Sequence, residues 1–231
     1  DDADLAALAV GGAPAANELE TMKVSNSGDS ALGDLTDSQG TDLAGLETLN
    51  ISGEGSLEIT AQLGDGQDLT VDASSGSVDT ELTLGAGDDT FTGGAGDDDV
   101  TIGAGDDTFT GGEGDDTVSF AGNLTDDDSA DGGEGTDTLQ VALAASVAGD
   151  LAVSNVEILR MDDANASASI DMDNVTGVTT LRVSEGDDNA ETVTVTDIAS
   201  TATTVQFIGD GKDAAQQFDG IVVDYDVTTA I

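Results

Sequence analysis

Apolar residues recur at nine-residue intervals in the middle of the chain. Phe91, Val100, Phe109 and Val118 each stand between two polar residues. Phenylalanine and valine alternate at these positions, so the pattern repeats fully every 18 residues. If one full coil takes that length, Phe91 stacks on Phe109 along one side of the coil, and Val100 stacks on Val118 along the other. The pattern therefore predicts stacked coils of very short strands.

The same stretch is an internal repeat. Residues 84–101 (LGAGDDTFTGGAGDDDVT) and 102–119 (IGAGDDTFTGGEGDDTVS) align without gaps and match at 14 of 18 positions. Each half is a nonapeptide of the form G-G-x-G-x-D-x-U-x, in which U is a large apolar residue. Leu84, Ile102 and Phe120 add a further apolar column at the same spacing. We predict an all-β fold, a parallel β-solenoid or β-roll whose coils repeat every ~4.8 Å as paired strands do.

Strand-like patterns continue on both sides of the repeat. Upstream, Leu69, Val71 and Ala73 alternate with polar residues, as in a half-buried strand. Downstream, residues 120–131 (FAGNLTDDDSAD) look like an insertion that interrupts the register, and residues 132–140 form a fifth complete nonapeptide. Later apolar clusters, separated by Gly, Asp, Asn and Thr turns, predict more strands.

These patterns divide the chain into four regions. We expect an irregular or partly helical N-terminal segment over 1–40, where the sequence is rich in alanine, and solenoid coils without the motif over 41–83. The β-roll itself is expected over 84–140, followed by further β-strand coils and the C-terminal end over 141–231.

The composition of the chain excludes several kinds of partner and of metal site. The 231 residues include 49 Asp and Glu but only four Lys and Arg, which gives a formal net charge of −45. Nucleic acid and anionic membranes are excluded as partners because this charge would repel them. Without His or Cys, ordinary zinc, copper and iron–sulfur sites are excluded. No apolar run approaches the roughly 20 residues of a membrane span, so no membrane insertion is expected. The start lacks Met and a basic segment, which indicates a processed form or a piece of a longer chain.

The Gly/Asp turns have the chemistry of a calcium site. Calcium prefers six to eight hard oxygen ligands at about 2.3–2.6 Å, and G-x-G-x-D supplies carbonyls and a carboxylate from a very short segment. Stacked coils would place Asp89 and Asp107 on one ion, and Asp98 and Asp116 on another. Asp137 is the candidate ligand of the fifth nonapeptide. The carbonyls expected to complete the shells lie near Gly85, Gly87, Gly94, Gly96, Gly103, Gly105, Gly112 and Gly114.

Other Asp residues are interpreted as ordinary surface or turn residues. The other Asp of each adjacent pair (Asp88, Asp97, Asp106, Asp115) is expected to face solvent as a hydrated acidic ridge. Asp68, Asp188 and Asp213 stand in isolated G-x-D fragments, which more often mark simple turns.

The nonapeptides resemble the repeats-in-toxin (RTX) family over 84–119 and 132–140. This resemblance implies one-step type I secretion and folding by extracellular calcium. The flanking segments "LETLNIS" and "VEILRM" are similar to calcium-dependent bacterial surface-layer proteins of the RTX type. The ending over 222–231 (VVDYDVTTAI) is similar to type I secretion signals, although a final edge strand would look the same.

The chain lacks the side chains of a serine or cysteine triad and of an H-E-x-x-H zinc site, so we do not expect an enzyme. The preferred hypothesis is an extracellular structural protein, of the surface-layer or matrix type, that binds Ca2+ and assembles with itself on the bacterial surface through acidic, calcium-bridged faces. Two alternatives stand beside it: an RTX adhesin stalk, and an accessory secretion or folding module of a secreted enzyme. An ice-binding adhesin is disfavoured, because the outward positions that would carry Thr and Asn are occupied by Ala86, Asp88, Ala104 and Asp106.

Overall fold

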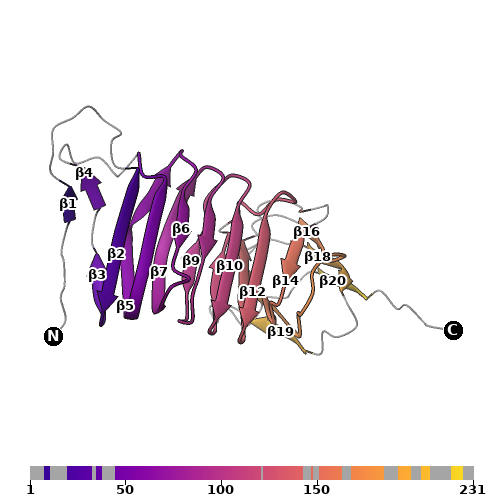
Figure 1. Cartoon of the computed structure of the whole chain (residues 1–231). Helices are drawn as coiled ribbons and strands as arrows, with labels where there is room; N and C mark the ends of the chain where they lie inside the picture. Colours follow the sequence, from indigo (N-terminus) through magenta and orange to yellow (C-terminus); the bar gives the residue numbers. More distant parts are fainter. Residues whose placement is uncertain are drawn as a thin grey trace.

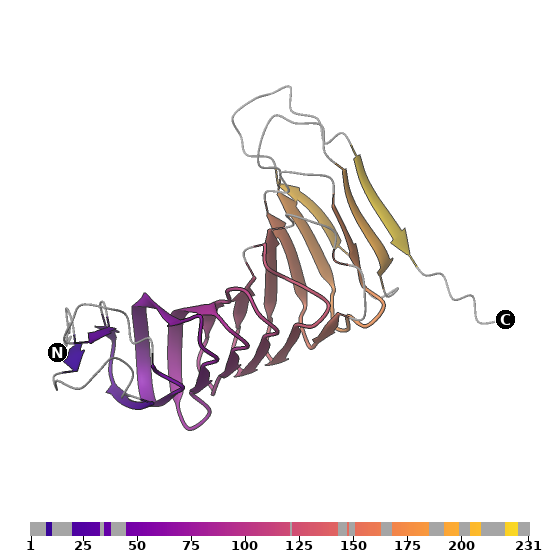
Figure 2. The same ribbon diagram turned by 90° about the horizontal axis from the view of Figure 1, so that it is seen from above.

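The computed structural model consists of short strands linked by turns. It describes residues 8–10, 20–32, 35–37, 45–120, 122–142, 147, 151–162, 168–184, 192–198, 204–208 and 220–225. Twenty strands and no helix occur in these ranges, and every strand pair in them is parallel. The strands stand side by side along the long axis in Figure 1, and Figure 2 shows the same coils from above. The predicted all-β parallel solenoid is confirmed.

Each coil contributes one strand to each of two faces. The first face contains β6 (Thr70–Asp72), β8 (Thr90–Thr92), β10 (Thr108–Glu113), β12 (Ser129–Glu134) and β14 (Ala152–Ser154). The second face contains β7 (Ser77–Ala86), β9 (Asp99–Thr101), β11 (Thr117–Ser119), β13 (Thr138–Ala142), β15 (Ile158–Asp162), β17 (Thr180–Ser184) and β19 (Thr204–Ile208). The long strand β5 (Thr48–Asp65) pairs with both β6 and β7 and so joins the two faces.

The apolar columns predicted from the nine-residue spacing form the core. Phe91 pairs in register with Phe109, and their rings stack with centroids 5.5 Å apart and planes 8° from parallel. Val100 pairs with Val118 on the other face. All four side chains are at most 2% exposed. A strand of three residues buries only one such side chain, so the coils depend on stacking with their neighbours for stability.

Residues 120–131 are not an insertion outside the roll. Ser129, Ala130 and Asp131 belong to β12 and pair with Thr108, Phe109 and Thr110 of β10. The coil from Asp107 to Asp128 is 21 residues long instead of 18, so only three residues have been added. The register of both faces therefore continues through this coil into the fifth nonapeptide.

The described part of the N-terminal segment forms strands, so the expected partial helix is wrong there. These strands are β1 (Leu8–Val10), β2 (Thr21–Ser27), β3 (Ser30–Leu32) and β4 (Leu35–Asp37). β2 pairs along its full length with β5, which places Met22 beside Leu49 and Val24 beside Ile51. This alternation of apolar and polar residues lets β2 cover the end of the core, and tertiary pairing of this kind overrides local helix preference. The sheet thus begins before residue 41.

Beyond the repeats, the second face continues through β15, β17 and β19. A separate parallel sheet contains β16 (Ala168–Asp171), β18 (Thr192–Ile198) and β20 (Gly220–Tyr225). Val153 of β14 bridges to Val175, so the first face also extends past the last nonapeptide.

Candidate calcium-binding turns

The turns between the two faces line up in two columns at opposite edges of the roll. The column of turns that end at Asp89, Asp107 and Asp128 is called the first edge, because each of these turns leads into the first face. The column of turns that end at Asp98, Asp116 and Asp137 is called the second edge, because each of these turns leads into the second face. Both columns arise because the nonapeptide places one turn on each side of an 18-residue coil.

All six of these Asp side chains are buried, with 1% of each exposed. In each case the Oδ1 atom accepts a hydrogen bond from the backbone N–H of the corresponding residue one coil earlier. The distance is 2.7 Å from Asp89 N to Asp107 Oδ1 and 2.8 Å from Asp98 N to Asp116 Oδ1. It is also 2.8 Å from Asp116 N to Asp137 Oδ1. One carboxylate oxygen therefore ties each coil to the preceding coil.

The other oxygen of four carboxylates has no partner. The Oδ2 atoms of Asp89, Asp98, Asp116 and Asp137 are buried and form no hydrogen bond. Burying an unpaired carboxylate oxygen costs free energy unless a cation or a donor satisfies it. The turns thus provide carboxylate oxygens that a cation would satisfy, as the calcium hypothesis requires.

Main-chain carbonyls converge on these oxygens at the second edge. A Cβ atom added to Gly93 would collide with Asp98 Oδ2 and with the carbonyl oxygen of Gly111. At Gly111 it would meet Asp116 Oδ2 and the Gly132 carbonyl, and at Gly132 it would meet Asp137 Oδ2 and the Asn155 carbonyl. Each space that a side chain would fill is lined by a carboxylate oxygen and a carbonyl oxygen from the next coil. Hard oxygens in this combination suit calcium.

The sequence prediction omitted Gly93, Gly111 and Gly132. It considered the turn as G-x-G-x-D, whereas these residues are the first glycine of G-G-x-G-x-D. At the first edge the corresponding positions hold the buried residues Leu84 and Ile102. The glycine at the first position of the motif was therefore the signal that distinguishes the two edges.

The predicted glycines align from coil to coil. Gly103 and Gly105 lie against the carbonyls of Gly85 and Gly87 at the first edge, and Gly112 and Gly114 lie against those of Gly94 and Gly96 at the second. Gly112 and Gly114 have φ values of +122° and +127°, which residues with a Cβ rarely adopt. The turns can stack this closely because no side chain separates their backbones.

Burial raises the pKa of the turn carboxylates. The pKa rises to about 7 for Asp89 and Asp116 and to about 6 for Asp98 and Asp107, from an ordinary value of 3.8. Loss of hydration is the largest cause, the backbone N–H donors oppose it, and nearby carboxylates add to it. The pKa of Asp137 is raised for the same main reason. Without a cation, the folded turns therefore disfavour the charged carboxylates.

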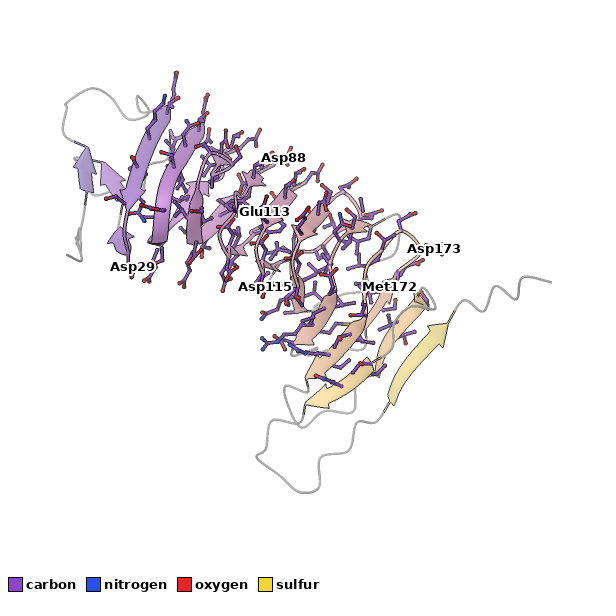
Figure 3. All side chains as sticks on the ribbon, turned by 60° about the horizontal axis from the view of Figure 1, so that its bottom comes forward. Asp29, Asp88, Glu113, Asp115, Met172 and Asp173 are labelled. Atoms are coloured by element: carbon purple, nitrogen blue, oxygen red, sulfur yellow. The ribbon has the colours of Figure 1, made fainter. Side chains whose placement is uncertain are left out.

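The other Asp of each adjacent pair is exposed, as predicted. Figure 3 labels two of them, Asp88 and Asp115, whose side chains project outward from the ribbon. These residues also form hydrogen bonds between coils. Asp88 Oδ1 accepts the N–H of Asp106 at 3.0 Å, and Asp97 Oδ1 accepts that of Asp115 at 2.8 Å. Asp68 belongs to the same exposed column, because its Oδ1 accepts the N–H of Asp88 at 3.0 Å. These exposed carboxylates line the surface beside each column of buried ones.

Within the described ranges, no group of three or more Asp, Glu, His or Cys side chains converges on one point. The candidate sites differ from such a cluster because the backbone supplies part of the ligands. Two predicted turn residues, Asp188 and Asp213, lie outside the described residues.

Three further residues extend the columns beyond the prediction. Asp128 follows Asp107 at the first edge, and its Oδ1 accepts the N–H of Asp107 at 2.8 Å. Glu157 follows Asp137 at the second edge, where its Oε2 accepts the N–H of Asp137 at 2.9 Å. Asn155 has a φ of 51°, and its carbonyl lies over Gly132. The similarity of D-D-S-A-D-G-G at 127–133 to D-D-T-F-T-G-G at 106–112 was the available signal for Asp128.

Parallel coils, buried carboxylates at both edges and glycine turns define a β-roll of the calcium-binding type. Comparison with protein families agrees: residues 76–109 and 103–122 match the RTX calcium-binding nonapeptide repeat, in four copies. No curated protein and no solved structure matches the chain. The chain carries repeats of the RTX family, and such repeats bind Ca2+. Asp128, Asp137 and Glu157 lie beyond the matched residues.

Proposed function

We propose that this protein is a calcium-stabilised extracellular structural protein that assembles with copies of itself on a bacterial surface. RTX repeats support a calcium-binding protein of the secreted type, and β-rolls built from them are typically structural, not catalytic. The described part of the chain contains no helix that is long and apolar enough to cross a membrane. The observation that carries the proposal is the combination of buried, unpartnered carboxylates with an extreme surface charge.

Calcium in the turns has a clear structural role in this proposal. The Oδ2 atoms of Asp89, Asp98, Asp116 and Asp137 are buried and have no partner. At the second edge, a carbonyl oxygen of the next coil lies close to this oxygen, so the site is complete only when successive coils stack. Binding energy then becomes folding energy, because the unfolded chain offers no preformed site. We propose Asp89, Asp98, Asp107, Asp116 and Asp137, with the carbonyls of the adjacent glycines, as the ligands.

Calcium inside the turns does not neutralise the molecule. Even one ion for each of the four unpartnered carboxylates would leave a net charge of about −37. The surface carboxylates remain close to one another. For example, the neighbouring carboxylate of Asp127 raises the pKa of exposed Asp106. At ~0.15 M salt, screening still leaves a Debye length of about 8 Å, so close approach of two copies requires bridging cations.

The exposed Asp columns are suited to this bridging. Asp88 and Asp106 are linked coil to coil at one edge, and Asp97 and Asp115 at the other, which gives regular rows of carboxylates with one oxygen directed at a backbone N–H. We propose that weaker calcium sites shared between such rows on neighbouring copies hold an assembly together. Because they are open to solvent, these sites should empty before the buried ones.

Stepwise removal of calcium tests the proposal. Sedimentation velocity and circular dichroism are measured on the same samples as calcium is lowered, with sodium chloride added to keep the ionic strength constant. The expected result is dispersal into monomers at a calcium concentration that still preserves the β-roll spectrum. Monomers at every calcium concentration would remove the assembly proposal and favour an adhesin stalk or an accessory module.

A double variant separates bridging from folding. Asp97→Asn with Asp115→Asn keeps an Oδ1 acceptor for the backbone N–H of the next coil but removes two exposed charges. We expect it to change the calcium concentration for assembly and to leave the concentration for folding nearly unchanged. Equal shifts in both midpoints would contradict the assignment of this row to assembly.

A further inference from the structure

Asp128 differs from four of the other buried Asp residues in how its second oxygen is satisfied. Its Oδ2 accepts a hydrogen bond from the backbone N–H of Thr125 at 2.7 Å and another from Thr125 Oγ1 at 3.1 Å. The corresponding atoms of Asp89, Asp98, Asp116 and Asp137 have no partner. At Asp128, two donors from the chain occupy the oxygen that at those four positions is left for a cation.

Both donors belong to Thr125, which lies in the loop that makes this coil three residues longer. Segment 122–127 makes its own turn, in which Asn123 N donates to the Phe120 carbonyl at 2.7 Å and Asp127 N donates to Thr125 Oγ1 at 3.3 Å. Leu124 is only 8% exposed and belongs to the hydrophobic core, so it fixes the loop beside the column. The loop is therefore held in place independently of any ion.

We infer that this loop replaces calcium at the Asp128 turn, and that the first edge ends there without an ion. The Asp128 carboxylate keeps its link to the preceding coil through Oδ1, while Thr125 supplies the donors for Oδ2. The second edge has no such loop and continues through Asp116 to Asp137, whose Oδ2 is unpartnered. The two edges thus differ in the number of ions that they hold. This inference rests on calcium binding by the turns and does not depend on self-assembly.

The first test compares two substitutions at corresponding positions. Asp116→Asn and Asp128→Asn each keep one side-chain oxygen for the Oδ1 hydrogen bond, so both coils remain linked. The calcium bound per full-length chain is counted by equilibrium dialysis and native mass spectrometry on dilute, monomeric protein. Asp116→Asn should lose at least one ion, whereas Asp128→Asn should bind as many ions as the wild type. Loss of an ion in Asp128→Asn would overturn the inference.

The second test restores an 18-residue coil. Residues 121–126 are replaced by the Gly-Ala-Gly of residues 103–105, so that the turn reads F-G-A-G-D-D, as at 102–107 except for its first residue. Removal of Thr125 frees Asp128 Oδ2, and the variant should bind one more ion than the wild type. An unchanged count in a folded variant would contradict the inference, and if the variant does not fold, the paired Asn substitutions decide alone. Because every sample is monomeric, failure of self-assembly would leave these counts unaffected.

Discussion

At the scale of single residues, the two oxygens of each turn carboxylate have different roles. In Asp98, Oδ1 accepts the N–H of Thr80 at 2.8 Å, while Oδ2 is buried without a partner. The first role holds the coils in register and survives without charge. The second requires a cation, so a substitution that removes only the charge separates the two roles.

Asp98→Asn should therefore weaken calcium binding while preserving the coil. Its amide oxygen can still accept the Thr80 N–H, but its NH2 group cannot bind a cation. We expect the calcium midpoint for folding, followed by circular dichroism, to rise by roughly tenfold or more, because a lost charged contact is worth about 1.5–3 kcal/mol. Asp97→Asn, at the exposed neighbouring position, is the control and should shift the midpoint little. Equal shifts would show that the buried position has no special role.

The raised pKa values predict opposite pH effects with and without calcium. The pKa of Asp89 and Asp116 is about 7 in the folded chain against an ordinary 3.8. Below about pH 4 these groups are protonated in both states, and as pH rises to about 7 the unfolded state loses its protons first. Folded stability without calcium therefore falls over this window. With calcium, protons compete for the same oxygens, so acidification weakens binding.

Calcium-stripped protein should accordingly gain β-structure as pH is lowered from about 7 to about 4. When calcium is added back, the calcium concentration at the midpoint of the titration should rise over the same pH range, because protons compete for the carboxylate oxygens. Circular dichroism follows both. One molar sodium chloride at pH 7 is the control, since it screens surface repulsion without protonating buried groups. If salt reproduces the whole effect of acid, surface charge and not the buried turns is responsible.

At the scale of elements, close stacking of turns matters more than the strands themselves. β8, β9 and β11 have three residues each and bury one apolar side chain each, which gives them little independent stability. The turns bring successive backbones so close that glycine carbonyls of one coil lie where a side chain of the next would stand. The first glycine of the motif is the point at which this spacing and the candidate cation site coincide.

Gly111→Ala should disrupt one second-edge site. The new methyl group would collide with Asp116 Oδ2 and the Gly132 carbonyl, which are the two oxygens proposed to face the ion. We expect the variant to bind one ion fewer and to melt at a lower temperature in calcium. Gly28→Ala is the matched control, because its Cβ would have no heavy atom within 4 Å. An unchanged calcium count in Gly111→Ala would place the ion elsewhere.

At the scale of the whole molecule, carboxylate repulsion opposes folding and few internal cations offset it. Only four basic residues face 49 acidic ones, and Arg160 forms an ion pair with Asp162, on its own strand, at 2.9 Å. The apolar columns are one side chain thick on each face, so burial alone gives limited stability. Cations from solution therefore decide whether the roll forms.

Calcium should drive folding of the full chain. In calcium-free buffer at pH 7 we expect a largely unfolded circular dichroism spectrum, and millimolar calcium should produce a β-rich one. Magnesium at the same ionic strength should be much less effective, because it requires near-octahedral geometry and retains its waters. A β-rich spectrum that does not respond to calcium would contradict the role assigned to the turns.

The sequence alone determined the β-roll, the stacking of Phe91 on Phe109 and the stacking of the turn Asp residues, Asp89 on Asp107 and Asp98 on Asp116. A repeat of nine residues sets strand, turn and register together, so these features are local and periodic. Only the tertiary structure decided that Thr125 satisfies Asp128 Oδ2, because a 21-residue coil breaks the period while the loop restores the register in space. It also decided that Glu157 continues the second edge, and that β2 is a strand beside β5. These features depend on the neighbouring coil, because its unpaired backbone N–H groups and exposed apolar side chains determine which residues can pack against it.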